Sequence, residues 1–176
     1  MGMEWRHHMV RRSNHYDAAF EEFLRAGCIP YVAVDEQRRA LIEDASLKSF
    51  DFIVYSETGP NLLVDVKGRQ FPTAGKSKWE NWATEDDIQS LLHWQRVFGD
   101  EFRAWLVFAY QILGDYEQTE FDNASVVRYR EETYAFYGVS VDEFATAMRP
   151  RSTSWGTVTL PRRIFRELRL PVAKML

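Results

Sequence analysis

Two acidic residues stand inside runs typical of β-strands, where a carboxylate is unexpected. Asp51 lies within the run Phe50 to Val54, and Asp65 lies within the run Leu62 to Lys67. Strands in the core of an α/β protein are usually almost continuously apolar, and an ionised carboxylate there is costly unless it is paired or binds a metal ion. Carboxylate oxygens are ligands that Mg²⁺ and Mn²⁺ prefer. The two runs therefore raise the possibility of a site for one of these ions.

Lys67 adds an ammonium group to this candidate site. Side chains alternate across a strand, so Asp65 and Lys67 point to the same face of theirs. Asp51, on the neighbouring strand, can face the same position. An alternative needs no metal ion: Lys67 neutralises Asp65 at the end of a strand, and Asp51 ends its own strand at the surface. The pattern of residue types alone leaves both interpretations open.

The surrounding residues predict the elements that position these groups. Apolar residues at helical spacing predict a helix over residues 14–26, capped by Ser13 or Asn14 and followed by Gly27. Runs rich in β-forming residues predict strands over 29–36, 50–56 and 61–69, the last two joined as a hairpin.

A second helix and a further strand follow the hairpin. Thr84 with Asp87 resembles a capping box and predicts a helix that ends at Gly99. The apolar run 102–110 predicts a buried strand. Beyond it, the sequence predicts a hairpin over 125–141, a short helix starting near Ser140, a strand over 155–160, and a last helix with Pro161 at its first position. This order predicts an α/β (α+β) fold in which helices cover a mixed sheet.

Length, composition and charge restrict the class of protein. The chain has 176 residues, 45% of them hydrophobic and 15% aromatic, which suits one folded domain. No apolar run is long enough to span a membrane, and no nucleotide-cofactor motif occurs. The single cysteine, Cys28, rules out an internal disulfide and is expected to be buried. A reducing cytoplasm fits this cysteine content, so we expect a cytoplasmic protein.

Positive charge gathers at the C-terminal end of the chain. The net charge is −4, but residues 149–176 alone carry +6, which leaves −10 for the rest. A basic segment on an acidic body is compatible with phosphate binding. A solvated surface helix is the simpler explanation of the same residues.

The sequence resembles the PD-(D/E)XK nuclease superfamily. Its hallmark is an acid in one strand and acid-x-lysine in the next, between two helices. The run Ser49-Phe50-Asp51-Phe52-Ile53-Val54 matches the first part, with phenylalanine in place of the usual proline, and Asp65-Val66-Lys67 matches the second. The resemblance implies a restriction-endonuclease-like core of order α-β-β-β-α-β over residues 13–112. Residues 1–12 are then expected to form a flexible tail, and 113–176 a C-terminal β/α extension packed on the same domain.

The resemblance also implies roles for individual residues. Asp51 and Asp65 would be the metal ligands, helped by the Val66 carbonyl, and Lys67 would orient or activate water and stabilise negative charge. Many members add an acid from the first helix and some a glutamine from the second. The candidates for these positions are Asp17, Glu21 and Gln89, each of which also has a structural explanation as a cap or surface residue.

The function implied is hydrolysis of DNA phosphodiester bonds by an endonuclease that uses Mg²⁺ or Mn²⁺, with a metal-bound water as nucleophile. A homodimer is expected by analogy. The alternative is an inactive module on the same fold that binds nucleic acid or protein. Trp79 and Trp82 could stack on a base or fill a gap over the core. The residues expected to contact DNA phosphates are Lys76, Lys78, Arg162, Arg163 and Arg166.

Overall fold

The structure is a computed structural model that describes residues 14–34, 40–42, 45–72, 78–114 and 121–176. The expected N-terminal tail, residues 1–12, and the predicted DNA contact Lys76 lie outside the described residues. Among the described helices, none is long and apolar enough to cross a membrane.

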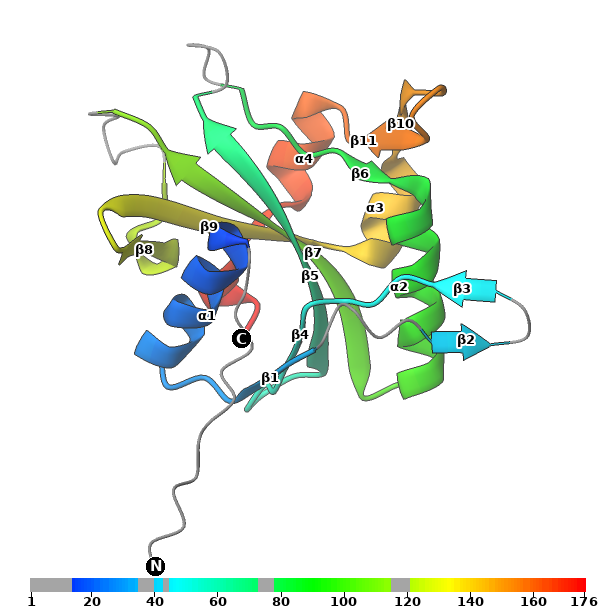
Figure 1. The fold of residues 1–176 in the computed structure, drawn as a ribbon, viewed down its shortest axis with the longest axis horizontal. Coiled ribbons are helices and arrows are strands. Elements are labelled where there is room, and N and C mark those ends of the chain that lie inside the picture. Colours follow the sequence, from blue (N-terminus) through cyan, green and yellow to red (C-terminus); the bar gives the residue numbers. More distant parts are fainter. Residues whose placement is uncertain (1–13, 35–39, 43–44, 73–77, 115–120) are drawn as a thin grey trace, which may run out of the picture.

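A seven-stranded mixed sheet forms the centre of the molecule (Figure 1). The strands follow the order β1-β4-β5-β7-β9-β12, and β8 pairs with β9. Their bounds are β1 Tyr31–Ala33, β4 Phe52–Val54, β5 Asn61–Phe71, β7 Phe102–Ile112, β8 Val126–Tyr129, β9 Glu132–Ser140 and β12 Leu170–Pro171. The long strands β5 and β7 run parallel, and the other pairs are antiparallel.

Helices cover both faces of this sheet. Their bounds are α1 His15–Ala26, α2 Glu85–Phe98, α3 Val141–Ala147 and α4 Arg162–Leu168. Phe20 of α1 belongs to the same core cluster as Val64 and Val66 of β5. On the other face, residues of α2, α3 and α4 form a second cluster that contains Leu63. Because side chains alternate along β5, Asp65 and Lys67 point to the face covered by α2 and α4.

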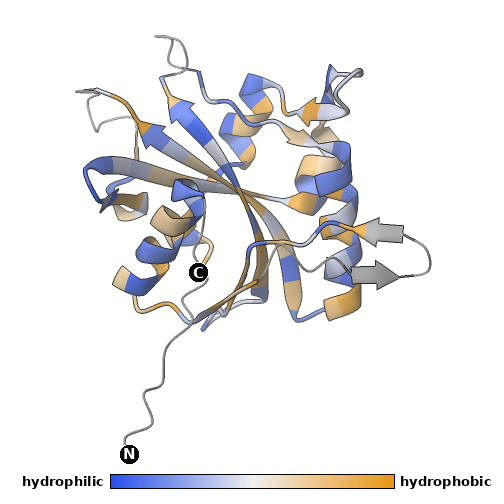
Figure 2. Ribbon diagram, viewed as in Figure 1, coloured by the Kyte–Doolittle hydropathy of each residue, from blue (hydrophilic) through white to orange (hydrophobic). Residues whose placement is uncertain are grey.

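The capping residues expected for the first two helices are present. The Asn14 side chain accepts a hydrogen bond from the Tyr16 backbone N–H, and Gly27 follows the end of α1. Hydrophobic and hydrophilic bands alternate along α1 (Figure 2), as an amphipathic helix requires. Thr84 and Asp87 form a complete capping box at the start of α2.

Two small sheets complete the described structure. β6 (Ala83–Thr84), β10 (Arg149–Ser152) and β11 (Thr157–Thr159) form a three-stranded sheet in the order β10-β11-β6. β2 (Ala40–Ile42) pairs with β3 (Ala45–Leu47). Single turns of 3₁₀ helix occupy Asn123–Ser125 and Val172–Lys174.

The predicted order of elements is confirmed, with corrections at short elements. The core follows α1, β1, β4, β5, α2 and β7. The sequence patterns did not predict β2, β3, β6, β10 and β12, each of two to four residues, because so few residues carry no periodicity. Pro161 is the N-cap of α4 and not its first helical residue, so α4 begins one residue later than expected, at Arg162. Cys28 is exposed, contrary to expectation, since it lies in the turn after α1 with φ of +53°.

Candidate active site

Strands β4 and β5 bring Asp51, Asp65 and Lys67 to one pocket of about 240 Å³. Asp51 directly precedes β4, and the other two residues are separated by Val66 on β5. The remaining residues that line the pocket are Asn14, Asp17, Lys48, Ser49, Val66 and Asp87. Both carboxylates and the ammonium group of the sequence motif therefore face the same space.

Asp51 is fixed by two hydrogen bonds to β5. Its backbone N–H donates to the Val64 carbonyl at 2.9 Å, and its carboxylate accepts from the Val66 backbone N–H at 2.5 Å. The β4–β5 ladder ends at the pair Phe52 and Val64. In a strand, the N–H and C=O of one residue are directed to the same neighbouring side, so the Val66 carbonyl is on the side of β5 where Asp51 lies.

Lys67 lies between two carboxylates. Its Nζ is 2.7 Å from Asp65 Oδ2 and 3.1 Å from Asp87 Oδ2. Burial disfavours the charged ammonium, but the opposite charges of Asp65 and Asp87 outweigh burial and hold the pKa of Lys67 above its ordinary value. Lys67 therefore keeps its proton at neutral pH.

Asp87 and Lys48 are site residues that the sequence did not reveal. Asp87 Oδ1 accepts from Lys48 Nζ at 2.9 Å, so the chain of charges runs Asp65, Lys67, Asp87, Lys48. Burial alone would raise the pKa of Asp87, but Lys67, the capping contacts of Thr84 and the contact with Lys48 lower it to about 2. The sequence predicted that Asp87 caps α2. It could not predict that Asp87 also pairs with Lys67, because that contact depends on where the start of α2 lies relative to β5.

Helix α2 also holds the backbone on which Lys48 stands. The Lys48 N–H donates to the Ser90 hydroxyl at 3.2 Å, and the Trp94 indole N–H donates to the Lys48 carbonyl at 2.8 Å. In the sequence, Lys48 is distinguished only by its position three residues before Asp51. A lysine at that spacing is too common to have identified Lys48 as a site residue.

The structure separates the two candidate acids of the first helix. Asp17 is buried, lines the pocket, and its Oδ1 is 3.4 Å from Asn14 Nδ2. Glu21 is absent from the residues that line the pocket, and it accepts hydrogen bonds from Arg25 and Tyr31. Asp17 is therefore the acid of α1 that lies at the site.

Gln89 is exposed on α2 and does not line the pocket. Successive residues of an α-helix are about 100° apart, so Gln89 lies on nearly the opposite side of α2 from Asp87. The helix face that meets the site is set by the buried residues Asp87 and Ser90.

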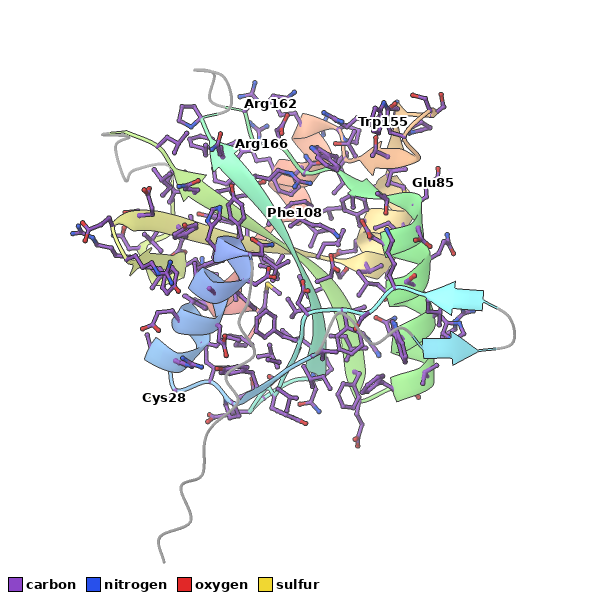
Figure 3. The ribbon with its side chains drawn as sticks, viewed as in Figure 1. Cys28, Glu85, Phe108, Trp155, Arg162 and Arg166 are labelled. Atoms are coloured by element: carbon purple, nitrogen blue, oxygen red, sulfur yellow. The ribbon has the colours of Figure 1, made fainter. Side chains whose placement is uncertain are left out.

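Of the predicted DNA contacts, the four that the structure describes do not line the pocket that holds Asp51, Asp65 and Lys67, which we call the acidic pocket. Arg162 and Lys78 line a second pocket of about 490 Å³, and Lys78 Nζ is 3.5 Å from Glu80. Arg163 pairs with Glu167 at 2.9 Å, and Arg166 is exposed. Figure 3 shows Arg162 and Arg166 along α4, which covers the same sheet face as α2.

Trp79 and Trp82 differ in their surroundings. The Trp79 ring packs against four aromatic rings, those of Phe71, Tyr110, Phe121 and Tyr137. It therefore fills a gap over the core. Trp82 is half-buried, and the guanidinium groups of Arg69 and Arg151 lie 4.0 and 5.0 Å from its ring centroid.

The donor set of the acidic pocket suits a small divalent cation. Within the described residues, no three His, Cys, Asp or Glu side chains form a cluster that could hold a metal ion by themselves. Mg²⁺ commonly takes one or two carboxylates and keeps several waters. Asp51, Asp65 and the Val66 carbonyl supply hard oxygen donors of this kind around a pocket with room for water.

Comparison with protein-family models and with curated protein sequences finds no match. A solved structure of Hjc, a Holliday junction resolvase from Archaeoglobus fulgidus, superimposes with a TM-score of 0.55 at 12% sequence identity. The match covers 92% of this chain and 97% of the resolvase chain. The protein has a restriction-endonuclease-like fold.

This restriction-endonuclease-like fold agrees with the α-β-β-β-α-β order predicted from the sequence. The acid of the first motif precedes β4, and the acid-x-lysine motif lies in the middle of β5. At 12% identity the likeness concerns the arrangement of the chain. The chemistry must be argued from the residues of the pocket.

Proposed function

We propose that this protein is a nuclease that hydrolyses DNA phosphodiester bonds with the help of Mg²⁺ or Mn²⁺. The observation that supports this most is the meeting of Asp51, Asp65 and Lys67 in one pocket of a restriction-endonuclease-like fold. The alternative interpretation is a salt bridge between Lys67 and Asp65 with Asp51 at the surface. It does not explain why Asp51 is buried or why its carboxylate accepts a hydrogen bond from the Val66 N–H.

Asp51, Asp65 and the Val66 carbonyl would hold the divalent ion. When bound, such an ion polarises a phosphoryl oxygen and lowers the pKa of water. Asp17 lines the same pocket from α1 and would orient water by accepting a hydrogen bond with its carboxylate. The hydrogen bond from the Val66 N–H keeps Asp51 in place before any ion arrives.

Lys67 would stabilise negative charge rather than remove a proton. The charges of Asp65 and Asp87 hold the pKa of Lys67 above its ordinary value, which favours the protonated ammonium as a donor over a role as general base. An ammonium has three N–H donors, and the contacts to Asp65 and Asp87 use two of them. The third can donate to a phosphate oxygen, and the two carboxylates fix its position.

We further propose that Lys78, Arg162, Arg163 and Arg166 contact the DNA backbone, with Lys76 added from the sequence alone. Three of the described residues are on α4, and Lys78 is in the segment before β6; Lys78 and Arg162 line the same pocket. The net charge of −10 over residues 1–148 makes this basic region the natural place for a polyanion to approach.

A nuclease assay with matched variants tests the proposal. Duplex, single-stranded and four-way branched DNA are incubated with Mg²⁺, with Mn²⁺ or with EDTA. We expect cleavage with either metal ion and none in EDTA, and a loss of about 100-fold or more in Asp65→Asn and Lys67→Ala. Lys174→Ala, at an exposed lysine, serves as the control and should cleave like the wild type.

Circular dichroism of each variant separates loss of chemistry from loss of fold. Binding of DNA by the wild type without cleavage under any metal condition would favour the inactive binding module. Equal cleavage by wild type and a folded Lys67→Ala variant would contradict the assignment of the site.

A further inference from the structure

The second pocket has the charge of a site for an anion. It lies among the segment 78–82, strands β10 and β11, and the start of α4. Three cationic side chains line it, Lys78, Arg151 and Arg162, against one carboxylate, that of Glu80. Its volume of about 490 Å³ is within the usual range for small-molecule sites.

The Trp82 indole and the Arg151 guanidinium lie next to each other in the lining of this pocket, with the guanidinium carbon 5.0 Å from the ring centroid. Arg69 and Arg151 both lie over Trp82, but only Arg151 lines the pocket. Arg69 is buried and donates to the Trp82 carbonyl, so it holds the indole from the protein side. Arg151 is exposed and lines the pocket together with Trp82, and guanidinium planes and indoles both stack on nucleobases.

The pocket is built before any ligand arrives. Buried Asn81 accepts hydrogen bonds from the Thr159 hydroxyl and the Leu160 N–H at 2.7 and 2.8 Å. Its amide donates to the Leu160 carbonyl at 3.3 Å and to the Trp79 carbonyl at 3.5 Å. These contacts tie the segment before β6 to β11 and fix the opening between them.

The two pockets are connected through the protein by short paths. Asp65, Lys67 and Arg69 are every second residue of β5, so their side chains point to the same face. Arg69 in turn contacts Trp82. Two residues after Trp82, the Thr84 hydroxyl accepts from Lys48 Nζ of the acidic pocket at 3.0 Å. The two pockets therefore lie close together on the same side of β5.

We propose that the second pocket binds an unpaired nucleotide of the substrate, with its base against Arg151 and Trp82 and its phosphates at Arg162 and Lys78. The choice of DNA as the polymer rests on the function proposed above. A base inside a duplex is already stacked on both faces, so only an unpaired base can enter. Frayed ends, overhangs and branch points supply such bases.

Binding measured without metal ions tests this inference separately from catalysis. Fluorescence anisotropy in EDTA compares a labelled single-stranded oligonucleotide with a blunt duplex of the same sequence. We expect tighter binding of the single strand, and a loss of about tenfold in Arg151→Ala, whose exposed side chain can be removed without unfolding. Arg128→Ala, an exposed arginine on β8, is the charge-matched control and should bind like the wild type.

Two further variants make the outcomes distinct. Asp65→Asn removes a charge that the nuclease proposal needs but alters no residue of the second pocket, so in EDTA it should bind the single strand at least as tightly as the wild type and keep the preference over blunt duplex. Trp82→Phe should retain binding and Trp82→Leu should lose it, with thermal melting used to verify folding. Equal losses in Arg151→Ala and Arg128→Ala, or no preference for single strand over blunt duplex, would overturn the inference even if the enzyme cleaves DNA.

Discussion

Replacement of Asp87 by asparagine removes the carboxylate shared by Lys67, Lys48 and the N-terminus of α2. The pKa of Asp87 is lowered from 3.8 to about 2, and each pKa unit corresponds to about 1.4 kcal/mol. A carboxyl group with a depressed pKa stabilises the fold above its unfolded pKa, and the contribution is lost as the pH falls through the folded pKa. Asp87→Asn should therefore lower the free energy of unfolding by about 2 kcal/mol at pH 7.

Urea unfolding across pH measures this contribution. The difference between wild type and Asp87→Asn should be constant above about pH 5 and should shrink towards zero between about pH 4 and pH 2. Asp86→Asn is the control, since Asp86 is 61% exposed and contacts Lys48 from the surface; it should change stability by less than about 1 kcal/mol. A difference for Asp87→Asn that is the same at pH 7 and pH 2 would show that its charge does not provide the stability.

Three further variants probe the rest of the structure. Asp51→Asn keeps an acceptor for the Val66 N–H, so metal-free melting should be unchanged or raised, while the increase in Tm that Mn²⁺ gives the wild type should vanish; a retained Mn²⁺ shift would remove Asp51 from the metal ligands. Gly68→Ala places a methyl group against the Tyr16 ring and should cost about 1–3 kcal/mol in urea unfolding; wild-type stability would mean that Tyr16 moves freely. Asn81→Ala deprives the segment 78–82 of its buried hydrogen bonds and should cost about 2 kcal/mol, with chemical denaturation as the measurement and an unchanged midpoint as the contrary result.

The core of the fold was predictable because its elements are long or capped. The apolar run that forms β7 and the capping box of α2 each carry a strong local signal. The short strands β6 and β12, of two residues each, depend on partners distant in sequence. Their formation follows from tertiary packing, which no local window contains.

The candidate site was predictable where one strand carries the pattern. Asp65 and Lys67 share a face because they are two residues apart on β5, and Asp51 directly precedes the adjacent strand β4. The contributions of Asp87 and Lys48 depend on the position of α2 over the sheet. Asp17 and Glu21 are four residues apart on the same side of α1, so the choice between them depends on which turn of α1 lies beside the pocket. These are long-range quantities, and spacing along the chain does not encode them.

The parallel pairing of β5 with β7 extends over eleven residues without a break in register. Lys67 and Arg69 stand on this one stiff strand, which rises about 3.3 Å per residue. The separation between the pocket at Lys67 and the pocket at Trp82 is then a fixed length set by the backbone. Under the proposed function, an enzyme of this design would cut at a constant offset from the unpaired nucleotide that the second pocket holds.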